Sequence, residues 1–339
     1  MEIKGINMCY GDSFIITWEG TDGEHTLLLD SGDAKSYKSN LRGYIEKLKH
    51  HIDLWIISHP HDDHIRGVME YIEDLMDGRN LPICKHWLFN PRKFEDASFD
   101  YSTDGSYAVS WSTGDKLSGY LRYKGFQLQD IVAKTGSKRI IDGLELNVVT
   151  PIIIPLIPKD NISEASDAMS SVGNDYDIKI ECFDINTYDE DKNDINSGSI
   201  SLILRHNRQT FFWMADSKAS IICDGLKLLG YSKEHPLLCD AATLPHHGSK
   251  ANANLELLSL LKCNTFIVTA NGENKYNLPN KETLVRVLNN PLRNRNEHIT
   301  FYLPDDNATL KSMFDIDGDD VFDKWNFEIK YFEGFLNLL

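Results

Sequence analysis

The sequence has few basic residues for its length. Its 35 lysines and arginines stand against 51 aspartates and glutamates, which gives a formal net charge of −16. Proteins that capture nucleic acid over a wide surface need clustered Lys and Arg for the phosphates. The shortage therefore argues against a long basic groove for duplex DNA or RNA. A smaller phosphate-bearing ligand stays compatible with the charge if bound cations supply the attraction.

The sequence also lacks any apolar run near the roughly 18 residues that a membrane-spanning helix needs. Its first residues, Met1–Lys4, enter a strand pattern at once, without the apolar segment of a secretory signal. The six cysteines form no C-x-x-C pair, and most have apolar neighbours, which is typical of reduced thiols. We therefore expect a cytoplasmic protein without a membrane partner.

One segment, Ser58–Gly67, concentrates side chains that bind metals. Its candidate ligands, in the pattern H-x-H-x-D-H, are His59, His61, Asp63 and His64. A buried strand is expected over 53–57 and a helix over 68–75, so the ligands fall in the turn between them. Imidazole nitrogens and carboxylate oxygens suit zinc, manganese or iron. A polar loop with incidental histidines is the alternative, and it is improbable at this density.

The order of strand, ligand loop and helix recurs along the chain. Further strands are expected over 14–18, 26–30, 86–89, 144–150, 200–205, 210–216, 241–244 and 266–268, and further helices over 41–48, 125–135, 219–229 and 255–261. Two irregular stretches, about 90–140 and 152–198, are interpreted as insertions, the first with a long loop over 95–119. The acidic run Asp189–Asp194 in the second is expected to be a solvated loop. With no linker between them, these elements predict a single domain over 1–339.

The H-x-H-x-D-H pattern resembles the metallo-β-lactamase superfamily. Other segments resemble one branch of it, the soluble domain of ComEC-type competence proteins (DNA uptake) and its stand-alone relatives. The segments, in the order of that branch, are Asn7–Ile16, Leu28–Gly32, Leu146–Pro151, Trp213–Asp216, Leu244–Lys250 and Asn271–Pro279. Of these, Leu244–Lys250 matches the branch's V-P-H-H-G-S-K almost letter for letter. The resemblance implies the metallo-β-lactamase fold, an αββα sandwich of the α/β class with its metal loops at one edge of two facing sheets.

The resemblance also implies one or two divalent ions, zinc or manganese. The implied ligands are His59 and His61 for the first ion, Asp63 and His64 for the second, Asp216 as a bridge, and one of His246 and His247, with His246 favoured, to complete the second site. Asp63 is also expected to accept a proton from metal-bound water. Asp30 is expected to orient a ligand histidine through its other ring nitrogen. Candidate substrate contacts are Lys250, Asn274 and Tyr276.

The sequence departs from the family pattern at two positions. Leu278 stands where the branch usually has the histidine of a G-H-P element. The wider superfamily places a further histidine in an H-T-P-G-S turn, which here corresponds to Ile195–Ser199. No histidine occurs between His86 and His206. The first metal site is therefore expected to be the weaker one.

Three functions fit these observations. The leading hypothesis is a metal-dependent phosphodiesterase or nuclease that attacks nucleic acid or nucleotides with metal-activated water. The same ions could instead hydrolyse a lactone, a thioester or another carboxylic derivative. The third hypothesis is a non-catalytic or regulatory subunit of a bacterial multiprotein assembly of the defence type, with the irregular stretches binding a protein partner. The full ligand set argues against this third hypothesis, because a pure scaffold has no need to keep it.

Overall fold

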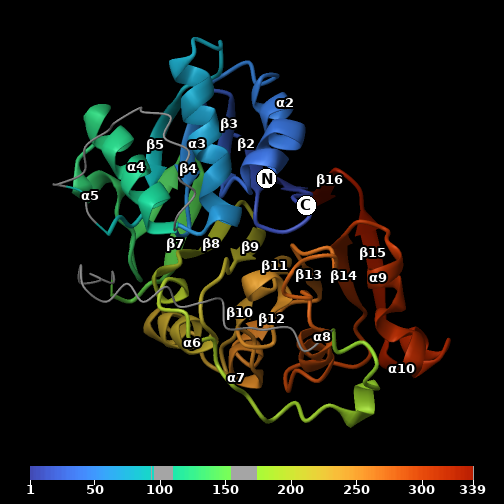
Figure 1. The fold of residues 1–339 in the computed structure, drawn as a ribbon. Coiled ribbons are helices and arrows are strands. Elements are labelled where there is room, and N and C mark those ends of the chain that lie inside the picture. The colour runs from blue at the N-terminus through green and yellow to red at the C-terminus, as the bar shows by residue number, and fades with distance from the viewer. Residues whose placement is uncertain (93, 95–109, 154–173, 339) are drawn as a thin grey trace.

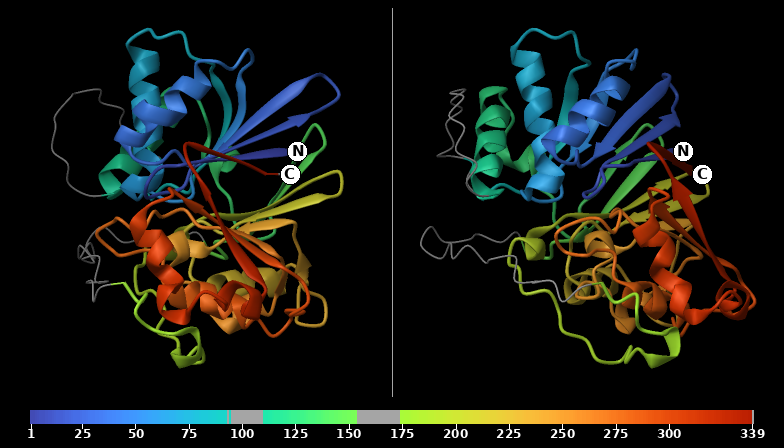
Figure 2. Two further views of the ribbon diagram at one scale, coloured as in Figure 1. Left: turned by 90° about the vertical axis from the view of Figure 1, so that its right-hand side faces the viewer. Right: turned by 45° about the vertical axis from the view of Figure 1, so that its right-hand side comes forward.

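The computed structural model describes residues 1–92, 94, 110–153 and 174–338. Two sheets face each other in the middle, and helices cover both outer faces (Figures 1 and 2). This four-layer αββα sandwich confirms the fold class expected from the sequence. Most of the loop expected over 95–119 and much of the insertion over 152–198 lie outside the described residues.

The first sheet has the strand order β16-β1-β2-β3-β4-β5. Its strands are β1 (Glu2–Ile6), β2 (Phe14–Glu19), β3 (Glu24–Leu29), β4 (Ile52–Ile56), β5 (Cys84–Leu88) and β16 (Phe335–Leu338). Strands β3, β4 and β5 run parallel, so their carboxyl ends lie at the same edge of the sheet. All five residues of β4 are buried, as expected for a strand that is covered on both faces.

The second sheet has the order β15-β14-β13-β11-β9-β8-β7-β6. Its strands are β6 (Lys138–Ile141), β7 (Leu144–Thr150), β8 (Ser201–His206), β9 (Gln209–Trp213), β11 (Ala241–Thr243), β13 (Thr265–Ile267), β14 (Ile299–Pro304) and β15 (Phe327–Phe332). Strands β10 (Leu237–Leu238) and β12 (Leu261–Lys262) form a separate parallel pair. Strands β9 and β11 are parallel neighbours, so their carboxyl ends also share one edge.

Helices form the two outer layers (Figure 1). Those that follow strands of the first sheet are α1 (Ala34–Ser36), α2 (Arg42–Ile45), α3 (Asp62–Met76), α4 (Ser110–Tyr123) and α5 (Leu128–Ile131); those in the second half are α6 (Ala219–Leu228), α7 (Leu255–Leu258), α8 (Lys281–Leu288), α9 (Ala308–Lys311) and α10 (Val321–Trp325). A π-helical turn over Tyr37–Leu41 joins α1 to α2. Within the described residues, no helix combines the length and apolarity needed to cross a bilayer.

Two predictions in the first insertion were wrong. Helix α4 occupies 110–123, where a loop over 95–119 was expected, and α5 covers only four residues of the helix expected over 125–135. The first half of α4 is rich in Ser, Thr, Gly and Asp, which hides the helical pattern. Its second half buries Leu117, Tyr120 and Leu121, which are three and four residues apart and therefore lie on one face.

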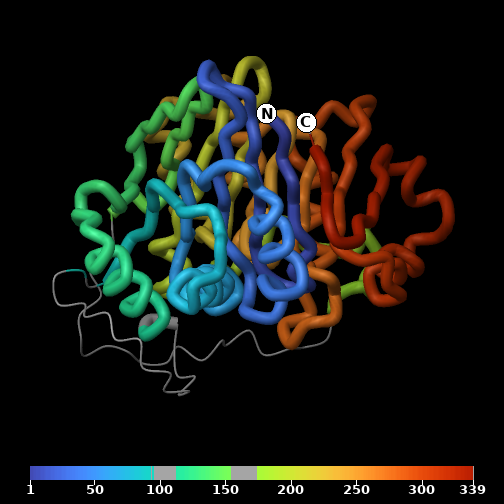
Figure 3. The backbone as a smooth tube through the Cα atoms, turned by 90° about the horizontal axis from the view of Figure 1, so that it is seen from above, coloured from blue at the N-terminus to red at the C-terminus, as the bar shows by residue number. Residues whose placement is uncertain are grey.

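The two sheets are held together by an apolar core between them. The rings of Phe14 on β2 and Phe211 on β9 lie 5.8 Å apart, which links the sheets directly. Two further cores fill the spaces between each sheet and its helices. Strand β1 pairs antiparallel with β16, so residues near both ends of the chain lie side by side (Figure 3). Strands β14, β15 and β16 were not among the elements expected from the sequence.

Candidate metal centre

The candidate ligands, and Asp30 that is expected to orient one of them, follow the ends of four strands. Asp30 follows β3; His59 and His61 lie in the loop after β4, and Asp63 and His64 in the first turn of α3; Asp216 follows β9; and His246 and His247 follow β11. Strands β3 and β4 belong to one sheet, and β9 and β11 to the other. Ligand loops at the carboxyl ends of parallel strands are a common way to build a site in α/β proteins. Each sheet thus contributes half of this candidate site.

The side chains form two groups that share Asp216. In one group, ligand atoms of Asp63, His64, Asp216 and His247 all lie within 4.8 Å of one another, and in the other so do those of His59, His61 and Asp216. Asp216 Oδ1 lies 3.5 Å from His247 Nε2, and its Oδ2 lies 3.6 Å from His59 Nε2. Oδ2 also lies 3.3 Å from His64 Nε2, so the Asp216 carboxylate contacts histidines of both groups. Asp216 therefore lies between the two groups, and its bridging of two ions stays a prediction.

Left-handed backbone conformations position several of these residues. The φ angles are 45° at Ala215, 48° at His246 and 56° at His247. Such angles are uncommon for residues with a side chain, and they concentrate at functional sites where the surroundings enforce them. The ComEC-type pattern has glycine at the position of Ala215, and a positive φ explains why glycine suits it.

A chain of hydrogen bonds fixes which nitrogen of His59 faces the site. Asp30 is fully buried and accepts from Ser58 N and Ser58 Oγ at 2.7 and 2.6 Å. Because the Ser58 hydroxyl donates to Asp30, it accepts from His59 Nδ1 at 2.9 Å. His59 therefore carries its proton on Nδ1 and presents the Nε2 lone pair to Asp216 and His61.

The histidines of the second group are held in the same way. His64 Nδ1 lies 2.6 Å from Asp30 Oδ2, the contact expected from the sequence for an orienting carboxylate. His247 Nδ1 lies 2.8 Å from Thr269 Oγ1 and 3.3 Å from Asp12 Oδ1. In both residues Nδ1 is thus engaged and Nε2 points at the shared carboxylates. Partners of this kind orient metal-binding imidazoles and raise their basicity.

Two buried atoms of the group have no hydrogen-bond partner among the described residues. They are His64 Nε2 and Asp216 Oδ1. Buried polar atoms normally have a hydrogen-bond partner, so two atoms without one in the same group of residues require an explanation. Nitrogen and oxygen donors in this mixture fit zinc or manganese, and the residues present therefore fit a divalent metal centre.

The charges of the group shift the pKa values of its members strongly. Burial and the positive charges of His64 and His61 hold the pKa of His59 well below its usual range, so this ring is neutral. Burial acts to lower the pKa of His247, but Asp216, Asp12 and Asp63 outweigh it and raise the pKa to about 10. Protons on the ring nitrogens thus compensate the clustered carboxylates. Metal binding must displace such protons, which is a general feature of sites of this type.

The acidic run Asp189–Asp194 is only in part the solvated loop expected from the sequence. Asp189 is exposed, but Asp191 turns inward and only 7% of its side chain is accessible. Asp191 accepts hydrogen bonds from Asn252 Nδ2 at 3.1 Å and Asn196 Nδ2 at 2.6 Å. Asn193 Nδ2 in the same run lies 3.4 Å from His61 Nε2. The run therefore forms part of the wall of the metal centre.

The three candidate substrate contacts lie in different settings. Lys250 Nζ is 3.5 Å from Glu282, so its charge is paired. The Asn274 side chain bonds to its own loop, accepting from Tyr276 N and donating to Leu278 O. Tyr276 is partly exposed, and its ring lies 5.6 Å from Tyr10, whose ring in turn lies 4.6 Å from His247. Of the three, Tyr276 is the one that these contacts connect to the ligands.

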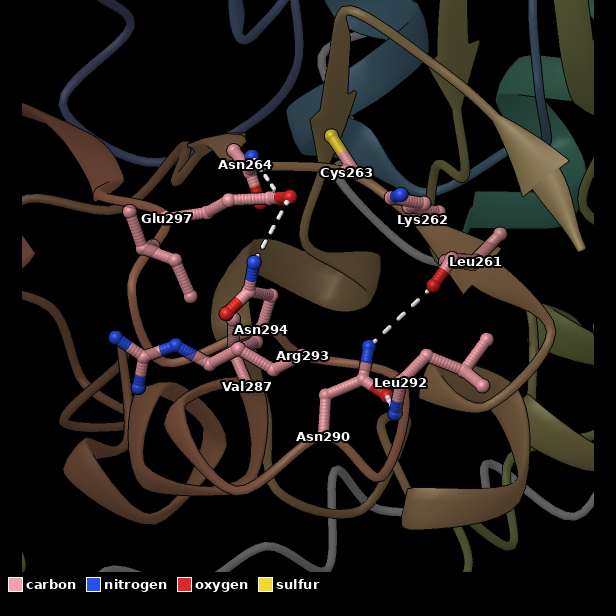
Figure 4. Close-up of a pocket in the computed structure, with 11 residues that line it drawn as sticks. Leu261, Lys262, Cys263, Asn264, Val287, Asn290, Leu292, Arg293, Asn294 and Glu297 are labelled. Carbon is pink, nitrogen blue, oxygen red and sulfur yellow. Dashed lines mark hydrogen bonds between the residues drawn. The ribbon is translucent and has the colours of Figure 1, made fainter.

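A separate hollow lies between α8, β12 and β14 (Figure 4). None of the candidate ligands lines it. Its polar side chains bind one another: Asn264 and Asn294 both donate to Glu297, at 3.0 and 3.4 Å. The hollow is therefore explained as a local structural feature and does not compete with the metal centre.

No family model matches the sequence, and no curated protein sequence is similar to it. Among solved structures, it is similar to zinc-bound PqqB from Methylobacterium extorquens, with 11% identity over 97% of this chain and 87% of that chain, and a TM-score of 0.44. The MIM-2 metallo-β-lactamase has 13% identity over 75% of this chain and 81% of that chain, with a TM-score of 0.37. A mutant of CmlA β-hydroxylase has 13% identity over 99% of this chain, with a TM-score of 0.43.

This chain spans about half of the CmlA β-hydroxylase chain, 53% of its length. Likenesses at these levels do not carry a function from those proteins to this one. The sheet order and the loops described above show an αββα sandwich with a cluster of candidate metal ligands at one edge of its sheets.

Proposed function

We propose that this protein is a metal-dependent hydrolase that cleaves phosphodiester bonds in nucleotides or in short or single-stranded nucleic acid. The assignment as a hydrolase rests on two observations. Asp63, His64, Asp216 and His247 lie close together, and two of their ligand atoms, His64 Nε2 and Asp216 Oδ1, have no hydrogen-bond partner among the described residues. Divalent ions in such a centre lower the pKa of bound water to about 7 and stabilise negative charge on the attacked group.

Asp63 has the position that a proton-accepting carboxylate needs. It lies in the first turn of α3, where the helix dipole favours a negative charge. Its side chain is 19% exposed, more than that of Asp216 at 2%, so water can reach it. Burial acts to raise the pKa of Asp63, but His64 and His247 hold it well below its usual range. The carboxylate is therefore ionised at neutral pH and ready to accept a hydrogen bond from water.

The observation that favours a nucleotide substrate is the aromatic surface beside His247. Tyr10 packs on the imidazole of His247, Tyr276 packs on Tyr10, and Lys275 Nζ lies 4.4 Å from the Tyr276 ring centroid. Aromatic rings next to a positive charge are the usual surface for stacking a nucleobase. With a net charge of −16, a compact substrate is favoured over a long duplex. The ComEC-type resemblance points to the same substrate class.

The test is a substrate panel on protein loaded with zinc or manganese. It contains a dinucleotide, single-stranded and duplex DNA and RNA, bis-p-nitrophenyl phosphate, a lactone and a thioester. We expect hydrolysis of phosphodiesters. Tyr276→Ala should raise the KM for the dinucleotide about 5- to 150-fold, because it removes one base–aromatic stacking contact with a free energy of roughly 1–3 kcal/mol. Tyr123→Ala, at a tyrosine that is 65% exposed on α4, is the matched control.

Faster turnover of the lactone or thioester than of every phosphodiester would replace this proposal with the carboxylic-derivative hydrolase. No turnover of any substrate by fully loaded protein would favour a non-catalytic subunit. An unchanged dinucleotide KM in Tyr276→Ala would remove the stacking argument while leaving the hydrolase assignment in place.

A further inference from the structure

The first ion would lack a ligand if only the residues expected from the sequence held it. His59, His61 and Asp216 form that group, and the family's third histidine corresponds to the segment around Ile195, which supplies no imidazole. Zinc centres with three protein ligands and a water are common, but a further imidazole would give this ion four protein ligands, one of them the bridging carboxylate. Among the described residues, the structure offers His246 at this point.

The hydrogen bonds of Asn252 fix the tautomer of His246. Asn252 is fully buried, and its Nδ2 lies 3.1 Å from Asp191 Oδ2, 3.3 Å from Asp216 O and 3.4 Å from Ser217 O. Three acceptors around one atom require that atom to be the amide nitrogen, so the amide cannot be turned round. Asn252 Oδ1 therefore accepts, and its partner is His246 Nδ1 at 2.9 Å.

With its proton on Nδ1, His246 presents a lone pair on Nε2. This nitrogen lies 3.5 Å from Asp216 Oδ2, the same oxygen that lies 3.6 Å from His59 Nε2. The lone pair on His59 Nε2 follows from its own bond to Ser58. Two nitrogens with lone pairs thus lie within 3.6 Å of one carboxylate oxygen, an arrangement that favours a cation beside that oxygen.

The backbone also holds His246 in place for this role. Its φ is 48°, a left-handed conformation that the surrounding loop enforces. Its N–H donates to Ala215 O at 2.8 Å, which ties the loop after β11 to the loop after β9. The His246 side chain is 16% exposed, so it lies at the rim of the centre and not in the core. The inward-turned Asp191 completes the support, because it anchors the amide that orients the ring.

We propose that His246 is the third histidine of the first ion, with Asn252 and Asp191 as its positioning residues. This inference rests on the metal centre proposed above and does not depend on the choice of substrate. It gives the first ion three imidazoles and a shared carboxylate, and it leaves His247 to the second ion. The first site is then complete, in contrast to the weaker site expected from the sequence.

The test measures bound Zn²⁺ per chain by mass spectrometry after gel filtration, together with affinity by competition against a chromophoric chelator. We expect two ions in the unaltered protein and one in His246→Ala. His59→Ala should also keep one ion, and the double variant His59→Ala/His246→Ala should still keep one, because both residues serve the same ion. His246→Ala combined with His247→Ala should keep none.

Asn252→Ala provides a second variant that leaves every ligand in place. Removing the partner that orients a ligand histidine typically lowers metal affinity about 10- to 100-fold, and we expect that loss for one ion only. Circular dichroism and unfolding temperature in the presence of a chelator check the fold of each variant. The unfolding temperature of metal-free His246→Ala should stay near that of the metal-free parent, while its increase on adding Zn²⁺ should shrink.

Four results would overturn the inference. The first is two ions bound by His246→Ala with unchanged affinity, and the second is a double variant that binds fewer ions than either single variant. The third is an unaltered protein whose only ion is lost in His247→Ala but kept in His246→Ala. The fourth is binding of no ion by the unaltered protein. If both ions bind as expected but no phosphodiester is cleaved, the proposed function fails and this inference stands.

Discussion

Replacing Asp30 by asparagine should weaken metal binding without touching a ligand. Asp30 has a φ of 50°, and asparagine tolerates this left-handed conformation better than most residues. The carboxylate accepts from Ser58 N, Ser58 Oγ and His64 Nδ1 at 2.6–2.7 Å. An amide has one oxygen, and if that oxygen stays on Ser58 N, the amide nitrogen faces the other two groups.

The expected effect follows from the tautomer of His64. Facing an N–H donor, His64 would carry its lone pair on Nδ1 and its proton on Nε2, the atom that points at Asp216. Loss of such an orienting partner typically costs about 10- to 100-fold in metal affinity, or about 1.4–2.7 kcal/mol. We therefore expect the second ion to bind more weakly by that factor, and the first ion to be weakened as well, because Ser58 Oγ would no longer donate to residue 30 and fix the tautomer of His59. Metal-free stability should fall by about 1–3 kcal/mol, the cost of a buried group left without a partner.

Zinc titration against a competing chelator measures the affinity, and urea unfolding with chelator measures the stability. The matched control is Asp74→Asn, at a buried carboxylate that accepts from Tyr37 and Arg42 on the outer face of the same sheet. It should lose stability and keep its metal affinity. If Asp30→Asn binds zinc within twofold of the parent, the orienting role of Asp30 is refuted.

Three further predictions concern other parts of the chain. Asp63→Ala should lower phosphodiester hydrolysis at least about 100-fold with an unchanged circular dichroism spectrum, because its side chain contacts ligand histidines and not the core; activity within a few-fold of the parent would contradict this. For His25, burial lowers the pKa, but Asp142 and Asp53 outweigh it and raise the pKa, so its stabilisation is present below the unfolded pKa and is lost as pH rises through the folded pKa. His25→Gln should therefore cost more stability in urea unfolding at about pH 5.5 than at about pH 8.5, and equal losses would count against it. Gly67→Ala should destabilise by about 1–3 kcal/mol, because its Cβ would lie 2.2 Å from a backbone oxygen of the loop after β3; a stability equal to that of the parent would show that the helix can shift without cost.

The cluster of candidate metal ligands could be predicted from sequence because its signal is local. Four of them fall within six residues, and each side-chain type limits the chemistry. The partners that orient them could not be predicted in the same way. Asn252 and Asp191 are 61 residues apart, and both belong to residue types that occur in any loop. Asn252 lies only six residues after His246, but Asp191 is brought to this point by the fold, and no spacing in the sequence points to it.

The fold shows the same division between local and distant information. Strand β4 is a short apolar run, and its position was readable from residues 53–57. Helix α4 was missed because its polar first half obscures the apolar spacing of its second half. The pairing of β1 with β16 joins segments at opposite ends of the chain, as in the register of Ile3 with Leu338. Such a pair is set by the closure of the whole sheet, which local patterns do not describe.

The position of the metal centre has a consequence for the lifetime of the protein. Its candidate ligands follow strands of both sheets, His59 and His64 in the first and Asp216 and His247 in the second, so an ion bound there would join the two halves of the sandwich. An ion that binds the folded chain alone adds about 2.7 kcal/mol of stability when its free concentration is about 100 times its Kd. A loss of that size can change the abundance of a protein several-fold, through chaperones and proteases. If the centre binds metal as proposed, we therefore expect a cell short of the metal to hold less of this protein.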